Sequence, residues 1–89
     1  MSTLEIIHLR SSGEALESLI ATIRTSIAGG GESSDTVTLF RRQGLETDLA
    51  VHIHRAGPRV GKGPSTLALQ LAAALRSYGI VEHTVWEEA

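Results

Sequence analysis

The chain contains no cysteine, which excludes disulfide bonds, thiolate catalysis, iron–sulfur clusters and cysteine-ligated zinc. Any metal site would therefore use histidine or carboxylate ligands. No apolar stretch approaches the ~20 residues that a helix needs to cross a bilayer. The first residues also lack a basic segment followed by an apolar run, the pattern of a secretory signal. We therefore expect a cytoplasmic protein with no membrane partner.

Aromatic residues are scarce, and neither sign of charge dominates. Phe40, Tyr78 and Trp86 are the only residues of the Phe, Trp and Tyr class. Eight basic residues stand against ten acidic ones, which gives a net charge of -2 at pH 7. Nucleic-acid-binding domains usually carry a basic face, and those that bind RNA on a sheet also stack bases on aromatic side chains. We therefore expect no nucleic-acid partner.

Two apolar periodicities divide the chain into strands and helices. A period of two, typical of strands, runs over residues 36–41, 47–55 and 80–86, and residues 3–10, which are apolar on both sides, predict a central strand. A period near 3.6 predicts one helix over residues 12–28 and a second from Ser65 to Gly79, capped by Ser65 or Gly63. Gly44 is the expected turn between the second and third strands.

The resulting order, β-α-β-β-α-β, is that of a ferredoxin-like α+β domain, and it accounts for residues 1–89 as a single domain. Right-handed crossovers place both helices on one face of an antiparallel sheet with strand order 4-1-3-2. The core then lies between the helices and that face. Its expected members are Leu16, Leu19, Ile20, Ile23, Leu49, Val51, Ile53, Leu67, Leu71 and Leu75.

The other face of the sheet is left uncovered in this arrangement. On the third strand, the more apolar set of alternating residues is Leu49, Val51 and Ile53, which we expect to face the helices. The other set, Ala50, His52 and His54, then lies on the uncovered side. The same side can also receive Phe40 and one set of the first strand. That set is Leu4, Ile6, His8 and Arg10. Monomers seldom expose so large a patch, so we expect a homodimer in which two such faces meet.

Four histidines lie on strands that the predicted order makes neighbours, and they converge on the uncovered face if Val81 and Val85 share the side of His83. The expected ligand-binding residues are His8, His52, His54, His83, Arg10, Phe40 and Trp86. Two alternatives stay open: the four histidines bind a transition metal, or they only hydrogen-bond to water. No carboxylate is expected beside them, which favours water over metal. For Trp86, the alternative is a place in the core or the dimer interface.

Residues 56–65 (AGPRVGKGPS) are similar to a phosphate-binding loop in outline only. Such a loop runs Gly, four residues and then Gly-Lys-Ser/Thr. Ala56 stands in place of its first glycine, and Gly63 stands in place of the hydroxyl residue. We therefore interpret the segment as a surface loop whose Arg59 and Lys62 could attract an anion.

With its element order, its length and its terminal strands LEIIHL (residues 4–9) and EHTVW (residues 82–86), the whole chain resembles the dimeric α+β barrel superfamily. Its nearest resemblance is to the antibiotic-biosynthesis-monooxygenase-like group. This resemblance implies subunits that pack sheet to sheet, with a ligand pocket inside the barrel or between helices and sheet. It covers cofactor-independent monooxygenases, haem-degrading enzymes, lactone isomerases and proteins without an assigned role.

Several enzymes of these groups use a pocket asparagine, often with tryptophan or histidine, and this chain has no asparagine. The resemblance therefore implies the fold without naming a catalytic residue or a cofactor. Three functions remain: a dimer that binds a small ligand, a monooxygenase-like enzyme, and a purely structural dimerisation module. We favour the first, because the uncovered face is polar enough for a pocket but lacks a recognisable catalytic set.

Overall fold

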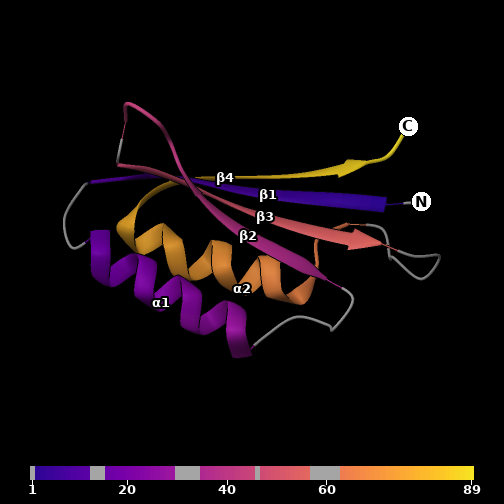
Figure 1. Cartoon of the computed structure of the whole chain (residues 1–89), viewed down its shortest axis with the longest axis horizontal. Coiled ribbons are helices and arrows are strands. Elements are labelled where there is room, and N and C mark those ends of the chain that lie inside the picture. The colour runs from indigo at the N-terminus through magenta and orange to yellow at the C-terminus, as the bar shows by residue number, and fades with distance from the viewer. Residues whose placement is uncertain (1, 13–15, 30–34, 46, 57–62) are drawn as a thin grey trace.

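The computed structural model describes residues 2–12, 16–29, 35–45, 47–56 and 63–89. Strands and helices follow the predicted order (Figure 1). They are β1 (Ser2–Ser11), α1 (Leu16–Gly29), β2 (Thr36–Arg41), β3 (Asp48–Ala56), α2 (Thr66–Leu75) and β4 (Gly79–Glu87), with a short 3-10 helix (Arg76–Tyr78) before β4. The strand bounds agree with the predicted ranges to within one residue at each end, whereas α2 ends earlier than predicted, where the chain tightens into the 3-10 turn.

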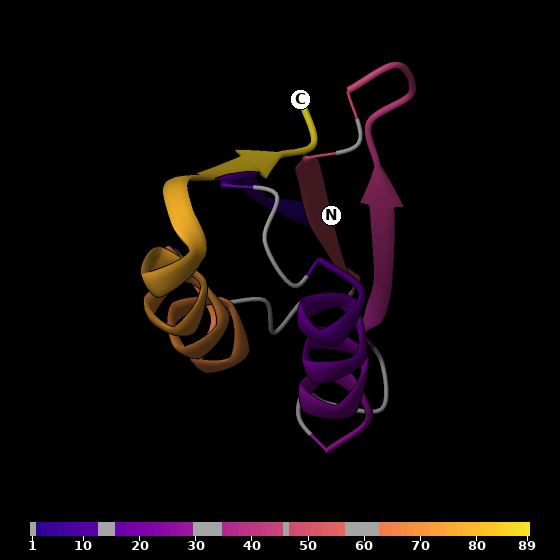
Figure 2. The same cartoon turned by 90° about the vertical axis from the view of Figure 1, so that its left-hand side faces the viewer.

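The four strands form one antiparallel sheet in the order β2-β3-β1-β4. This is the predicted order 4-1-3-2 counted from the opposite edge. Both helices lie on the same face of the sheet, and Figures 1 and 2 show no described helix over the other face. The predicted ferredoxin-like α+β fold is therefore confirmed. In the described part of the chain, no helix is long and apolar enough to cross a membrane.

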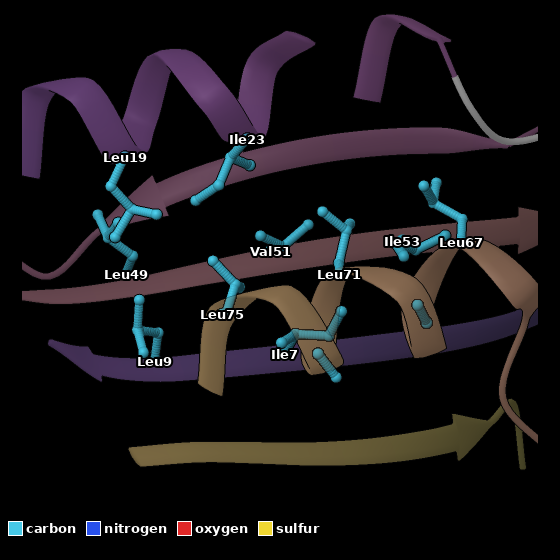
Figure 3. Close-up of a cluster of buried hydrophobic side chains, with 12 residues drawn as sticks. Ile7, Leu9, Leu19, Ile23, Leu49, Val51, Ile53, Leu67, Leu71 and Leu75 are labelled. Carbon is cyan, nitrogen blue, oxygen red and sulfur yellow. The ribbon is translucent and has the colours of Figure 1, made fainter. Parts of the chain in front are cut away.

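The core lies between the two helices and the sheet, where side chains from α1, α2, β1 and β3 point toward one another (Figure 3). Eight of the ten predicted core residues are buried, and the other two, Leu16 and Ile20, are partly buried against them. The sequence prediction did not name Ile7 and Leu9, which are fully buried on β1. The burial of Ile7 and Leu9 follows from the placement of Leu4 and Ile6 on the opposite face, because side chains alternate along a strand.

Local backbone chemistry explains where the elements begin and end. The Ser65 hydroxyl oxygen accepts a hydrogen bond from the Ala68 N–H at 3.2 Å, so Ser65 is the N-cap of α2. Gly44, in the β2–β3 turn, has a φ of 82°, which a residue with a Cβ rarely adopts. A Cβ at Gly79 would overlap the Arg10 carbonyl group, because β4 begins against the end of β1.

Two sequence interpretations fall wholly or partly outside the described residues. The segment compared with a phosphate-binding loop includes residues 57–62, and Arg59 and Lys62 are among them. The start of the first predicted helix includes residues 13–15. Both interpretations remain predictions.

Candidate ligand site on the open sheet face

The open face is the side of the sheet opposite the helices. Cross-strand pairing places Leu4 of β1 between His54 and Trp86, and Ile6 between His52 and Thr84. The residues of the open face include Ser2, Leu4, Ile6, His8, Arg10, Thr36, Thr38, Phe40, Asp48, Ala50, His52, His54, Ile80, Glu82, Thr84 and Trp86. Six of the seven predicted ligand-binding residues therefore lie on this face.

His83 is the exception, and its expected place on the open face is wrong. In the observed register His83 lies opposite Ile7, which is buried in the core. Val81 and Val85 do share its side, as the prediction required, but that side faces the helices. The expected convergence of four histidines is therefore not formed. Among the described residues, no group of three or more histidine, aspartate or glutamate side chains is placed to hold a metal ion.

His8 instead has a carboxylate partner that the sequence prediction did not anticipate. Its Nε2 lies 3.0 Å from Asp48 Oδ2, and Arg42 donates to the same oxygen at 3.3 Å. Asp48 is only 3% exposed. An imidazole beside a buried carboxylate is held in one orientation, as histidines in binding and catalytic sites commonly are. One signal was present in the sequence: Asp48 shares the period of two that places Ala50 and His52 on this face.

A pocket of about 250 Å³ opens beside this pair. Its lining residues are Ile6, His8, Phe40, Arg41, Arg42, Asp48, Leu49 and Ala50. The Phe40 ring also contacts His52, with ring centroids 4.6 Å apart. The pocket therefore combines an apolar floor with a hydrogen-bonding imidazole and the Arg42 guanidinium, a composition typical of sites for small polar ligands.

Three other predicted residues lie on the open face without lining this pocket. Arg10, His54 and Trp86 are not among its lining residues. The Trp86 indole Nε1 donates a hydrogen bond to the Thr84 hydroxyl at 2.9 Å, and the residue is 57% exposed. The structure thus brings His8 and Phe40 together in the pocket, keeps His52 beside them, and leaves the other three separate.

A second imidazole–carboxylate pair lies under the helices. Glu5 is fully buried, and its Oε1 accepts a hydrogen bond from the Ser65 backbone N–H at 2.8 Å. His83 Nε2 lies 3.4 Å from the same oxygen, while Glu5 Oε2 and His83 Nε2 have no hydrogen-bond partner. Glu5 therefore ties the start of α2 to β1, with His83 as its nearby countercharge when that ring is protonated. The alternation of β1 places Glu5 in phase with Ile7 and Leu9, which was the signal for its burial.

Acid should weaken the protein through Asp48. Burial raises the pKa of this carboxyl, but hydrogen bonds and charge from His8 and Arg42 outweigh that effect and hold the pKa below its ordinary value of 3.8. A carboxyl with a lowered folded-state pKa stabilises the fold above its unfolded pKa, and this contribution is lost as the pH falls through the folded value.

We therefore expect the midpoint of urea unfolding to fall as the pH is lowered below about 4, and to fall more steeply for the wild-type protein than for Asp48→Asn, which lacks this carboxyl group. The variant should be less stable than the wild type near neutral pH, with the difference narrowing in acid. Parallel curves for the two proteins would contradict this role of Asp48.

The fold has solved counterparts, although no protein-family model and no curated protein matches the sequence. The structure of Rv0793 from Mycobacterium tuberculosis superposes with a TM-score of 0.71 at 16% identity, covering 100% of this chain and 96% of that one. SnoaB from Streptomyces nogalater, described as a cofactor-independent oxygenase, superposes with a TM-score of 0.62 at 18% identity, covering 99% of this chain and 93% of that one. At these identities the two superpositions show that the chain shares the fold of these proteins.

Proposed function

We propose that this chain forms a homodimer through its open face and binds a small ligand in the pocket beside His8 and Asp48. In this proposal each protomer is a single domain over residues 1–89, and the dimer is cytoplasmic, as expected from the sequence. The observation that carries the proposal is the pocket itself, because it combines an oriented imidazole, an arginine side chain and an apolar floor on the uncovered side of the sheet.

Exposed apolar side chains support the dimer. Ile80 is 67% exposed, Trp86 57% and Phe40 48%, and all three lie on the open face. Leu4 and Ile6 lie between them, half-buried. An uncovered apolar patch of this kind marks an interaction surface. Two copies related by a twofold axis would cover each other's patch with the same residues.

Pairing of the open faces would also close the pocket. The pocket is smaller than most sites for organic ligands, but a second sheet placed over it would add a wall and exclude water. Electrostatic and hydrogen-bonding contacts strengthen when water is excluded. The ligand that fits is a small molecule with an acceptor for the Arg42 guanidinium and a polar group for His8.

A charge on the open face should separate the dimer. Phe40→Glu places a carboxylate on the exposed patch, and Leu69→Glu places one on the outer side of α2 at similar exposure (48% and 52%). We expect sedimentation to give dimers for the wild type and Leu69→Glu and monomers for Phe40→Glu, with folded circular dichroism spectra for all three. A wild-type protein that is monomeric at micromolar concentration would overturn the proposal.

A monooxygenase-like enzyme is the second candidate. The support for it is the buried Asp48 that orients His8, because a histidine held in this way can act as a general base. SnoaB, whose fold this chain shares, is described as a cofactor-independent oxygenase. Oxygen uptake with small phenols, lost in His8→Gln, would favour the enzyme. Binding of the same phenols without uptake would favour the ligand-binding dimer, and neither response would favour a structural module.

A further inference from the structure

A second cavity lies on the helix side of the sheet, between α1 and the edge strand β2. It measures about 630 Å³, and it shares Arg41 and Leu49 with the pocket beside His8. Its floor includes Ile20, Leu39 and Leu49, while Arg24 and Arg41 lie on its walls together with Glu17. A volume of this size is typical of sites for small organic ligands.

The periodicity of the two elements explains this composition. Glu17, Ile20 and Arg24 are spaced by three and four residues, which places them on one face of α1. Leu39 and Arg41 are two residues apart on β2 and share the side facing the helices. Each element therefore contributes both an apolar and a basic side chain to the same cavity.

The charges in the cavity are unevenly paired. Arg41 Nη2 donates to Glu17 Oε1 at 3.0 Å, but the Glu17 side chain is 83% exposed and the Arg41 side chain 43%. Exposed ion pairs of this kind contribute little stability and exchange readily. No ion pair is found for Arg24 within the described residues. Two positive groups and one negative group leave this cavity with a net charge of +1.

We propose that the α1–β2 cavity binds a free organic anion with an apolar tail, such as a medium-chain carboxylate. The tail lies over Ile20 and Leu39, and the carboxylate accepts hydrogen bonds from Arg24, with Arg41 adding positive charge. Glu17 lowers the affinity for the ligand, because it repels the ligand carboxylate and competes with it for Arg41. The site is formed within one chain and does not depend on dimerisation.

Decanoate, kept below its micelle concentration, is the probe that tests this site. We expect decanoate to shift the NMR methyl signals of Ile20 and Leu39, and decanol and decylamine to bind at least about tenfold more weakly, since a charged hydrogen bond is lost or replaced by repulsion. Shifts confined to open-face residues such as Ile6, or equal affinity for the three probes, would overturn the proposal.

Three single variants test both the direction and the magnitude of the expected changes in decanoate affinity. Arg24→Gln should weaken decanoate binding about tenfold, whereas Glu17→Gln should strengthen it several-fold by removing the competitor. Arg76→Gln, an exposed arginine of the 3-10 helix after α2, should leave the affinity unchanged. All three side chains are exposed, so the fold should be retained and thermal melting can verify it. If Glu17→Gln weakens binding, or Arg76→Gln weakens it as much as Arg24→Gln, the proposed site is wrong.

Discussion

Replacing Leu9 with alanine should lower the free energy of unfolding by about 3 kcal/mol, a loss typical of a leucine removed from a packed core. Leu9 is fully buried on β1, where it lies between Leu49 of β3 and Val81 of β4. It also belongs to the cluster that joins both helices to the sheet (Figure 3). Because β1 has a paired strand on each side, the neighbours cannot easily move to fill the space.

Leu69→Ala is the matched control for this substitution. Leu69 lies on α2 but is 52% exposed, so its truncation removes little buried surface. The free energy of unfolding should fall by less than about 1 kcal/mol in Leu69→Ala, because alanine's higher helix propensity offsets part of the loss. Urea denaturation of both variants measures the two losses, with an unchanged slope as evidence of the same transition. Similar losses for Leu9 and Leu69 would show that the buried faces are misassigned.

Replacing His83 with leucine should cost about 3 kcal/mol, because it removes the imidazole that lies 3.4 Å from the buried Glu5 carboxyl group. Glu5 is fully buried and its neighbours across the sheet are Ile53 and Val85. Its remaining contact is the Ser65 N–H at the start of α2. A buried carboxyl group with one hydrogen bond is poorly compensated for its lost hydration, which weakens the packing of α2 on β1.

A double-mutant cycle isolates this effect. Glu5→Gln removes the charge but keeps an oxygen that can accept from the Ser65 N–H, so we expect this variant alone to lose little stability. Combined with His83→Leu, it should recover most of the stability lost in His83→Leu alone. His54→Leu, at an exposed histidine of the open face, serves as the control and should change stability little. A double variant no more stable than His83→Leu would show that the two side chains are not coupled.

Alternation and helical spacing determined much of this fold before any tertiary contact was known. On β3, one set of alternating residues (Leu49, Val51 and Ile53) is far more apolar than the other, so only one orientation buries it. On α1, Leu19 and Ile23 recur one turn apart and define the buried stripe. The right-handed crossover rule then accounts for the strand order and for both helices on one face.

Tertiary pairing alone decided the orientation of β4 and the partners of the charged groups. Both alternating sets of β4 contain large apolar residues, Val81 and Val85 in one and Ile80 and Trp86 in the other, so periodicity says which residues share a face but not which face is buried. Pairing with β1 resolved this and turned His83 toward Glu5. The contact between His8 and Asp48 likewise needs the β1–β3 register, because residues 40 positions apart meet only when the strands pair.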